Sequence, residues 1–461
     1  MQVYNTMSRR KEELVPQQEG VISMYVCGPT VYDFIHIGNA RPLIVFDTFR
    51  RYLEYRGYKV IYVQNFTDID DKLIRKANRE GITVPEVAER YIKEYYRDAD
   101  ALGIMRSTVN PRATEHIDDI IALVQTLIDK GHAYPVDNGD VYFSVRSYRG
   151  YGKLKGQDIN DMENGVRIDP SDIKHDPLDF ALWKGAKPGE PSWPSPWGPG
   201  RPGWHIECSA MSMKILGPTF DIHGGGQDLI FPHHENEIAQ SEAATGKPFA
   251  RYWMHNGYIN IDNQKMSKSL GNFFTVRDIT EQYDPEAVRM FMLGANYRNP
   301  LNFSRELMEQ AVTSLTRLRT ARERLEETVC DPSVECEGWK EQLDSFRTRF
   351  NEAMDDDLNT ADALGVLFDF ARFVNIFATQ PQCSKDIEAV KALYLELAGV
   401  LGLLKKDADS EFPEEAVKLL EERTAARKAK DWARADAIRN QLKDMGFAVE
   451  DSAQGPKLKK L

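Results

Sequence analysis

The stretch V21-I-S-M-Y-V-C-G-P-T-V-Y-D-F-I-H-I-G-N39 contains the pattern from which the fold is predicted. Residues 21–27 are an apolar run typical of a buried strand, a Gly-containing loop follows, and a helical pattern runs from about Asn39 to Tyr55. A second strand is predicted over K59-V-I-Y-V-Q-N65 and a charged amphipathic helix over 68–79. Strands alternating with helices predict an α/β fold with a doubly wound parallel sheet, which binds ligands at the carboxyl ends of its strands.

The rest of the chain divides by composition. Residues 1–130 form the first half of the α/β domain, and a Gly-, Pro- and Trp-rich segment over 131–203 is interpreted as an insertion. Its run P188-G-E-P-S-W-P-S-P-W-G-P-G-R-P-G203 is expected to hold no regular element. The α/β pattern resumes over 204–304. Residues 305–405 are predicted to be helical throughout, residues 406–415 form a linker, and a small unit spans 413–461, with a helix pair and a short strand over F447-A-V-E450.

Charge and cysteine usage exclude several classes of protein. The chain has 461 residues and a net charge of −12, so it is not a general binder of polyanions. Its N-terminus is too polar for a signal peptide, and no run approaches the roughly 20 apolar residues of a membrane helix. Its five cysteines are far apart in sequence. We therefore expect a cytoplasmic protein, without membrane contact, whose thiols are mostly free.

The stretch F231-P-H-H-E-N-E-I-A239 is a candidate metal site. If it opens a helix, His233 and Glu237 are four residues apart and share a face. Together with Cys27 and Cys208 they make a plausible tetrahedral zinc set. The alternative is that these histidines and glutamates form a surface cluster or an ordinary helix N-terminus.

Two further stretches suit phosphate groups. In H36-I-G-N39 a glycine-containing loop turns into a helix, whose first backbone N–H groups favour anions. Gly38 permits close approach, and His36 and Asn39 can donate hydrogen bonds. In K265-M-S-K-S269, Lys265 and Lys268 can grip a triphosphate as charge grows on the leaving pyrophosphate. Taken singly, such stretches are more often an ordinary helix entry or a solvated turn.

The stretch G224-G-G-Q-D228 is a glycine triplet that ends in an acid. A carboxylate after such a loop can accept hydrogen bonds from both ribose hydroxyls, as acidic residues do in dinucleotide-binding folds. The alternative is a tight turn without a ligand.

The order of these three motifs on an α/β core resembles the class I aminoacyl-tRNA synthetases. Four stretches narrow the resemblance to the cysteinyl-tRNA synthetase family over essentially the whole chain: M24-Y-V-C-G-P-T-V-Y-D33, N65-F-T-D-I-D-D-K72, G203-W-H-I-E-C-S209 and F220-D-I-H-G-G-G-Q-D-L-I-F-P-H-H-E-N-E237. One position departs from the pattern, since Asn39 stands where the signature has histidine. Asparagine still donates a hydrogen bond, so ATP binding is expected to survive.

The resemblance implies a Rossmann-type catalytic domain that forms cysteinyl-adenylate from L-cysteine and ATP and then transfers cysteine to the 3′ end of tRNA(Cys). It implies one Zn²⁺ held by Cys27, Cys208, His233 and Glu237, which selects the substrate thiolate, and Mg²⁺ that accompanies ATP. His36, Asn39, Lys265 and Lys268 would stabilise the phosphates, while Gly38, Gly225 and Asp228 would contact ATP.

By the same resemblance, Thr67, Trp204 and His223 line the amino-acid pocket, although core packing is an alternative role, above all for Trp204. The helices over 305–405 would dock the tRNA stem. The unit over 413–461 would bind the anticodon, and Arg427, Lys428 and Trp432 are its candidate RNA contacts. The alternative is a solvated basic helix face, with Trp432 in a small core.

Two other functions fit parts of the pattern. A cysteine ligase of mycothiol biosynthesis shares the adenylate-forming core, but the segment after Pro413 argues against it. A non-catalytic RNA-binding paralogue is the second alternative, and the intact lysines and zinc positions argue against that. A monomer is expected, because no heptad seam with clear flanking charges stands out.

Overall fold

A four-stranded parallel sheet forms the centre of the molecule. The computed structural model describes residues 1–159, 173–265, 273–405, 413–452 and 455–460. The strand order is β10-β9-β3-β4, and every pair is parallel. The strands are β3 (Val21–Val26), β4 (Lys59–Gln64), β9 (Phe220–Gly226) and β10 (Ala250–Asn256). This topology confirms the predicted doubly wound α/β fold.

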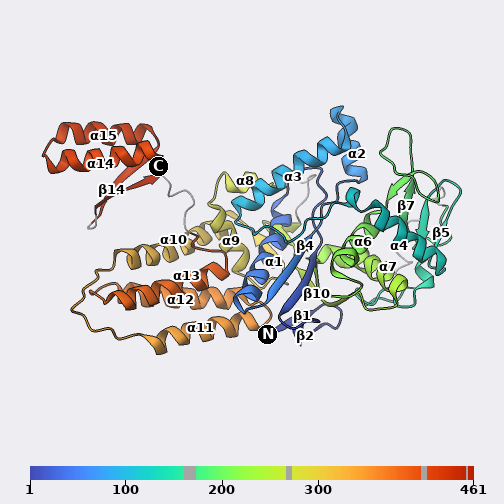
Figure 1. Ribbon diagram of the computed structural model, residues 1–461, viewed down its shortest axis with the longest axis horizontal. Coiled ribbons are helices and arrows are strands. Elements are labelled where there is room, and N and C mark those ends of the chain that lie inside the picture. Colours follow the sequence, from blue (N-terminus) through green and yellow to red (C-terminus); the bar gives the residue numbers. More distant parts are fainter. Residues whose placement is uncertain (160–172, 266–272, 406–412, 453–454, 461) are drawn as a thin grey trace.

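Helices lie on both sides of this sheet (Figure 1), and α1 (Ile37–Tyr55) packs directly on strands β4, β9 and β10. The other helices of this domain are α2 (Asp71–Glu80), α3 (Val84–Ala101), α6 (Trp204–Leu216), α7 (Glu235–Thr245), α8 (Val276–Thr280) and α9 (Pro285–Leu293). Helix α2 begins at Asp71 rather than at residue 68, because the Asp70 side chain accepts from the backbone N–H of Lys72 and caps the helix there. Smaller elements at the edges are β1 (Gln2–Asn5), β2 (Arg10–Glu13), β11 (Ile259–Ile261), β12 (Gln264–Lys265) and β13 (Leu301–Phe303).

The glycine triplet lies in strand β9, so the expectation of a loop there is wrong. Gly224 passes so close to helix α1 that a Cβ atom would lie 2.4 Å from Cζ of Phe46. A glycine is needed at this position because the strand and the helix make close contact, and not because the chain turns.

The insertion forms a second sheet with antiparallel order β5-β6-β7-β8, packed on helix α4 (Ile117–Asp129). Its strands are β5 (Ala133–Pro135), β6 (Val141–Phe143), β7 (Phe180–Gly185) and β8 (Gly200–Pro202). The expectation that residues 188–203 hold no regular element is therefore wrong for residues 200–202, which form strand β8. Strand β8 tolerates Pro202 because it lies at the sheet edge, where one side needs no ladder hydrogen bond.

Four helices follow the catalytic domain: α10 (Arg305–Glu327), α11 (Lys340–Asp355), α12 (Thr360–Phe377) and α13 (Ser384–Val400). The prediction of helix throughout 305–405 is wrong for residues 328–339, which are not helical. This segment folds back on the start of α13, where the Asp386 carboxylate accepts from the backbone N–H groups of Glu337 and Gly338.

The same contact brings Cys336 and Cys383 together in a disulfide, with Cα atoms 5.5 Å apart. The expectation of free thiols is wrong for this pair. This disulfide was not predicted, because the two cysteines are 47 residues apart in sequence and only the return of segment 328–339 brings them together. Cys27, Cys208 and Cys330 are free, as expected.

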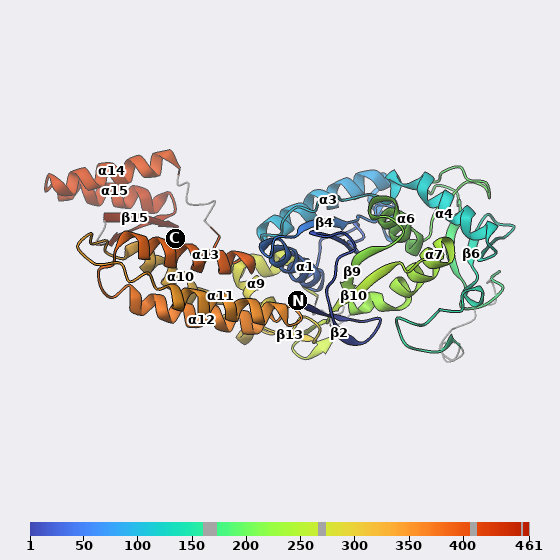
Figure 2. The same ribbon diagram turned by 60° about the horizontal axis from the view of Figure 1, so that its bottom comes forward.

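The C-terminal unit consists of the helix pair α14 (Glu414–Lys428) and α15 (Trp432–Asp444) with the hairpin β14 (Phe447–Ser452) and β15 (Gly455–Lys460). Helix α14 begins inside the stretch expected to be linker, and β15 was not foreseen. The unit has a small core of its own, around Ala416, Ile438 and Leu442. Figures 1 and 2 show it at the end of the elongated molecule opposite to the insertion.

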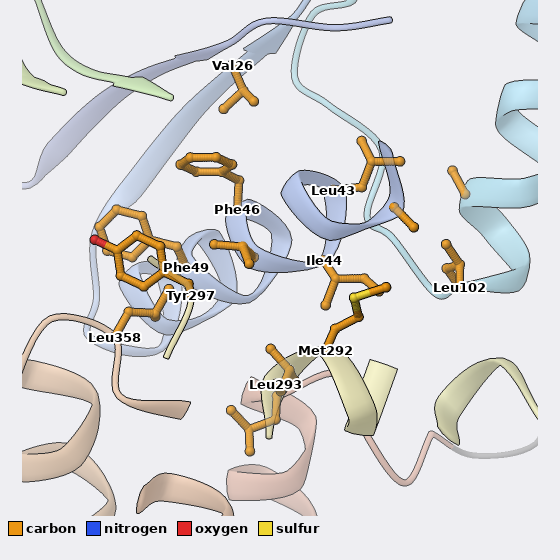
Figure 3. Close-up of a cluster of buried hydrophobic side chains, with 14 of the residues drawn as sticks. Val26, Leu43, Ile44, Phe46, Phe49, Leu102, Met292, Leu293, Tyr297 and Leu358 are labelled. Atoms are coloured by element: carbon orange, nitrogen blue, oxygen red, sulfur yellow. The ribbon is translucent and has the colours of Figure 1, made fainter. Parts of the chain in front are cut away.

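A continuous apolar core joins the catalytic domain to the helical bundle. Figure 3 shows Ile44 of α1 near Met292 of α9, and Phe49 of α1 near Tyr297 and near Leu358 of the bundle. Buried Arg289 adds polar contacts, because its guanidinium donates to Asp47 and to the carbonyl of Leu401. Within the described ranges, no helix has the length and apolar character to cross a membrane.

Candidate metal centre and active site

Four elements of the catalytic domain bring the proposed zinc ligands together. Cys27 directly follows β3, Cys208 lies in α6, His233 lies in the π-helical turn η5 (Ile230–His234), and Glu237 lies in the first turn of α7. Helix α7 itself begins only at Glu235, but the preceding turn keeps His233 on the same face. Its Nε2 atom is 3.0 Å from Oε1 of Glu237.

The distances among these atoms fit one tetrahedral zinc ion. The two sulfur atoms are 3.8 Å apart, and Cys27 Sγ is 3.5 Å from His233 Nε2 and 3.4 Å from Glu237 Oε1. Ordinary zinc bond lengths and tetrahedral angles give about 3.8 Å between two sulfurs and about 3.6 Å between sulfur and nitrogen or oxygen. All four ligand atoms lie within 4.8 Å of one another. The donor set and its spacing therefore fit the ion.

The charges in the cluster also suit a cation. Burial opposes ionisation of Glu237, but the His223 and His233 imidazoles hold the pKa of this carboxyl well below its usual range. The Cys27 thiol, through its hydrogen bond, lowers the pKa of Cys208 to about 6, against the effect of burial. Negative charge therefore concentrates on Cys208 and Glu237, in a buried site where a divalent ion would neutralise it.

Two further histidines orient the ligands. His223 Nε2 lies 2.8 Å from Oε2 of Glu237, which turns the other carboxylate oxygen toward the cysteines. His205 Nδ1 lies 2.9 Å from Nδ1 of His233, so that the Nε2 atom of His233 faces the cluster. Hydrogen bonds of this kind fix the ring orientation and the basicity of metal ligands.

A second group of potential ligands, Cys27, His223, His234 and Glu237, overlaps the first. It shares Cys27 and Glu237, so one ion cannot use both groups with the same geometry. The first group is favoured because it contains two sulfur donors, which zinc binds well. In addition, His234 Nε2 is 3.9 Å from the nearest oxygen of Glu237, farther than His233.

Two of the candidate phosphate-binding residues, His36 and Asn39, lie at the start of α1. The backbone N–H of His36 donates to Oδ1 of Asn39 at 3.2 Å, which leaves the amide nitrogen of Asn39 as its donor group. The chain returns to this point after the lysine-containing loop, since the N–H of Ile37 donates to the carbonyl of Phe274 at 3.1 Å. The backbone of Lys265 lies in β12, and Lys268 lies outside the described residues.

Gly38 lies in the first turn of α1, and Gly225 and Asp228 lie at the carboxyl end of β9 and just beyond it. A Cβ atom at Gly225 would lie 2.9 Å from the ring of His234, so this glycine lets the strand pass close to the metal cluster. Asp228 is exposed, where its carboxylate is accessible to a ligand.

Two of the three expected amino-acid pocket residues contact the metal cluster directly. The Trp204 ring stacks on His233 with centroids 4.4 Å apart and is 40% exposed, which excludes core packing as its role. His223 is fully buried against Trp253 and contacts Glu237. Thr67 is buried nearby, and its hydroxyl donates to Glu207 at 3.0 Å.

Several residues of this site were not singled out from sequence. His205 and Glu207 lie within the W-H-I-E stretch, and His234 and Glu235 within H-H-E-N-E, so the motifs contained them without revealing their roles. His255 at the end of β10 carried no sequence signal, because it stands outside every motif and approaches the cluster only through the sheet order.

In the C-terminal unit, Arg427 and Lys428 are exposed at the end of α14, and Trp432 is 57% exposed at the start of α15. The alternative that Trp432 belongs to the small core is therefore wrong. Arg423 on the same helix is buried.

Three segments of the chain match known protein families. Residues 13–313 match the class I (C) tRNA synthetase catalytic domain, residues 349–405 match the DALR domain, and residues 409–456 match the cysteinyl-tRNA ligase anticodon binding domain.

Curated relatives match over the full length. A cysteine–tRNA ligase of Caldicellulosiruptor saccharolyticus is 59% identical over 467 residues, and one of Clostridioides difficile is 56% identical over 466 residues, each covering 100% of both chains. Among solved structures, Mycobacterium tuberculosis methionyl-tRNA synthetase in complex with methionyl-adenylate is similar in fold, with a TM-score of 0.57, 16% identity, and coverage of 83% of this chain and 89% of the other. A putative arginyl-tRNA synthetase of Campylobacter jejuni has a TM-score of 0.57 at 11% identity, covering 85% and 94%.

Proposed function

The chain belongs to the cysteine–tRNA ligase family of class I aminoacyl-tRNA synthetases, and we propose that its buried Cys/His/Glu cluster holds the zinc ion that selects cysteine. The enzyme ligates cysteine to tRNA in an AMP-forming reaction, and the anticodon-binding domain of the family is present at its C-terminus. This family membership favours the main interpretation over both alternatives from sequence, the mycothiol-pathway ligase and the non-catalytic paralogue.

The observation that carries the zinc proposal is the spacing of the four ligand atoms, all within 4.8 Å of one another. Cys27, Cys208, His233 and Glu237 would hold the ion, with His205 and His223 orienting His233 and Glu237. When bound, zinc supplies a position that prefers a thiolate to a hydroxyl. Serine is nearly isosteric with cysteine, so shape alone does not separate the two amino acids. A site matched to the thiol can nevertheless reject serine by about 10⁴ or more.

In the first reaction step, the carboxylate of cysteine attacks the α-phosphorus of ATP, and the bond to the β-phosphate breaks to release pyrophosphate. The attacking group is already ionised, so no general base is required. His36, Asn39, Lys265 and Lys268 are proposed to stabilise the charge that grows on the phosphates, and Mg²⁺ is expected to accompany ATP. Gly38 and Gly225 would allow close approach, and Asp228 would accept from the ribose hydroxyls.

Thr67, Trp204 and His223 are proposed to line the cysteine pocket. The position of Trp204, stacked on His233 with part of its ring exposed, supports this role. In the second step, a 3′-terminal ribose hydroxyl of tRNA attacks the adenylate carbonyl, an ester bond forms, and AMP leaves.

For the RNA, we propose that the bundle over 305–405 docks the tRNA stem and that the unit over 413–461 reads the anticodon. Arg427 and Lys428 would contact phosphates, and the exposed ring of Trp432 would stack on a base. The catalytic domain over 1–130 and 204–304, with the insertion over 131–203, would perform the chemistry. We expect a cytoplasmic monomer, which a solution mass near 52.6 kDa would support.

Metal content and pyrophosphate exchange on one purified sample test this function. The expected result is one zinc per chain, with exchange driven by cysteine and not by serine. Zinc without exchange would contradict the catalytic assignment. Exchange without zinc would contradict the role of the metal in selecting cysteine.

A further inference from the structure

Three consecutive aspartates stand where α11 ends and its loop to α12 begins, and each contacts a different part of the catalytic domain. Asp355 pairs with Arg56, just after α1, at 2.6 Å, and Asp356 pairs with Lys11 of β2 at 2.5 Å. Asp357 is fully buried, and its partners lie in β1 and in the segment that joins α9 to β13. The first two contacts are partly exposed surface pairs, whereas a buried carboxylate persists only with well-placed donors.

Three donors converge on the carboxylate of Asp357. Its Oδ1 atom accepts from the backbone N–H of Tyr4 at 2.7 Å and from the hydroxyl of Tyr297 at 2.9 Å. Its Oδ2 atom accepts from Nε of Arg298 at 2.8 Å, and the guanidinium of Arg298 also lies over the ring of Tyr4, 4.4 Å from the centroid. One buried charge therefore holds the side chains of residues 297 and 298 in place.

The backbone of the loop is strained at this position. Asp357 and Leu358 have φ values of +61° and +53°, a left-handed conformation that residues with a side chain rarely adopt. Such residues persist only where the surrounding contacts enforce the conformation, and they cluster at functional positions. Here the N–H of Asp357 donates to the carbonyl of Gln2 at 3.0 Å while its carboxylate reaches inward. The strained turn thus directs the carboxylate to segment 296–299 and not to solvent.

Segment 296–299 is also closely fitted to the catalytic domain. The guanidinium of Arg41 in α1 donates to the carbonyl of Asn296 at 3.3 Å, and the N–H of Gly257, just after β10, donates to the carbonyl of Tyr297 at 2.8 Å. Gly257 leaves no room for a side chain, because a Cβ atom would lie 2.4 Å from the carbonyl oxygen of Asn299. A shift of this close-packed segment would therefore be passed on to its neighbours.

One of these neighbours is the turn that carries Asp228. The side-chain amide of Gln227 donates to the carbonyl of Arg298 at 2.8 Å. Gln227 and Asp228 are adjacent in the 3₁₀ turn η4 (Gln227–Leu229), which directly follows β9. Asp228 is exposed, so the position of its carboxylate depends on where the backbone of this turn is held. The hydrogen bond of Gln227 is the contact that ties the turn to segment 296–299.

We propose that Asp357 is a positioning residue for ATP, which acts through Arg298 and Gln227 to hold the Asp228 carboxylate where it accepts from the ribose hydroxyls. The proposal rests on the proposed function, in which Asp228 binds the ribose. It gives the helical bundle a part in nucleotide binding, besides its proposed contact with the tRNA stem. The alternative is that Asp357 only fastens the bundle to the catalytic domain, so the test must separate positioning from stability.

Two variants of the full-length enzyme interrupt this connection at its two ends. Asp357→Asn retains an oxygen acceptor but loses the charge that holds Arg298, and Gln227→Met keeps the length of the side chain without its donor. Cysteine-dependent pyrophosphate exchange is measured with ATP and with 2′,3′-dideoxy-ATP, which lacks both ribose hydroxyls. With ATP, the KM should rise about tenfold in each variant and kcat should stay within about twofold, because the lost contact stabilises ground state and transition state alike.

The dideoxy nucleotide gives the result that a purely structural role would not produce. With this nucleotide, the KM of both variants should stay within about twofold of wild type, because the hydroxyls that Asp228 binds are already absent. The double variant should raise the KM for ATP no more than the larger single effect, since both changes break the same connection. A mere loss of folded enzyme would lower the apparent kcat and leave both KM values unchanged.

Asp355→Asn is the matched control, because it removes a contact of the same loop with α1, where its described partners are Tyr52 and Arg56. Its KM for ATP should equal that of wild type. Equal rises of KM for both nucleotides would overturn the proposal, as would unchanged KM values, additive effects in the double variant, or a rise in Asp355→Asn as large as in Asp357→Asn. If wild type had the same KM for ATP and dideoxy-ATP, the ribose contact of Asp228 itself would fail. No cysteine-dependent exchange in wild type would refute the proposed function.

Discussion

At the level of single residues, Cys208 offers the most direct test of zinc-based selection. Its sulfur lies 3.8 Å from that of Cys27, and Cys208→Ser replaces a soft donor with a hard, far less acidic one. We expect zinc per chain to fall and activation of serine to rise relative to cysteine, measured by pyrophosphate exchange with each amino acid. Cys330→Ser, at an exposed free cysteine, is the control and should change neither. Unchanged discrimination after zinc loss would refute selection by the metal.

His205 tests whether orientation of a ligand matters as well as its identity. The ring contacts His233 at 2.9 Å and would not touch the ion itself. Loss of such an orienting group lowers metal affinity by roughly 10–100-fold. We therefore expect His205→Ala to weaken zinc affinity by about that factor in a chelator competition, with partial rescue in His205→Asn, which retains a hydrogen-bonding side chain. Equal affinity in wild type and His205→Ala would show that His233 needs no such support.

At the level of elements, local periodicity was enough to predict β3, α1 and β4 almost to the residue, because apolar runs and helical spacing are properties of neighbouring residues. The four proposed zinc ligands were predictable because motif and chemistry pointed to the same residues. Features that depend on contacts between segments far apart in the sequence were not predictable. The Cys336–Cys383 disulfide needs the return of 328–339, and the role of His255 needs the order of strands in the sheet.

The strand position of the glycine triplet leads to a prediction about packing. A methyl group at Gly224 would lie 2.4 Å from the buried ring of Phe46, so Gly224→Ala forces α1 and β9 apart or moves the ring. Overpacking of this kind costs about 1–3 kcal/mol. The expected result is a loss of that size in the free energy of unfolding, measured by denaturant titration.

Gly365 is the matched control for this substitution. It lies on the exposed side of α12, and apart from the backbone of its own helix no described atom is within 4 Å of the Cβ position. Gly365→Ala should be neutral or stabilise the protein by up to about 1 kcal/mol, because alanine is the better helix former. If both variants lost the same stability, close packing at Gly224 would not be the cause.

At the level of the whole molecule, the ion pair between Asp47 and Arg289 joins α1 to α9, and Arg289 reaches the end of the bundle through the carbonyl of Leu401. Asp47→Asn leaves a buried guanidinium without its countercharge, which costs about 3–5 kcal/mol. The free energy of unfolding should fall by that amount. Asp369→Asn, which breaks the exposed pair with Arg349, should change it by at most about 1 kcal/mol.

The same pair gives a pH dependence of stability. Burial raises the pKa of Asp47, but the positive charges of Arg289 and Arg51 lower it by a larger amount. The pKa of this carboxyl is therefore below its ordinary value. A carboxyl with a lowered pKa in the folded state stabilises the protein fully above its unfolded pKa of about 3.9 and loses this effect as the pH falls below it. The stability difference between wild type and Asp47→Asn should therefore hold from neutral pH to about pH 4 and shrink below. A difference that shrank already between pH 7 and pH 5 would contradict this assignment.

We expect that amino-acid activation and RNA recognition can be separated by removal of the C-terminal unit. The C-terminal unit has its own small core around Ile438 and Leu442, whereas one continuous core joins the catalytic domain and the helical bundle. Removal of the chain from Pro413 onward should therefore leave cysteine-dependent pyrophosphate exchange nearly intact, because the sheet and the metal cluster keep their packing. Charging of tRNA should fall strongly, through a higher KM for tRNA, because the proposed anticodon contacts around Trp432 are lost. Equal losses of exchange and charging would show that the unit supports the catalytic domain rather than reading the RNA.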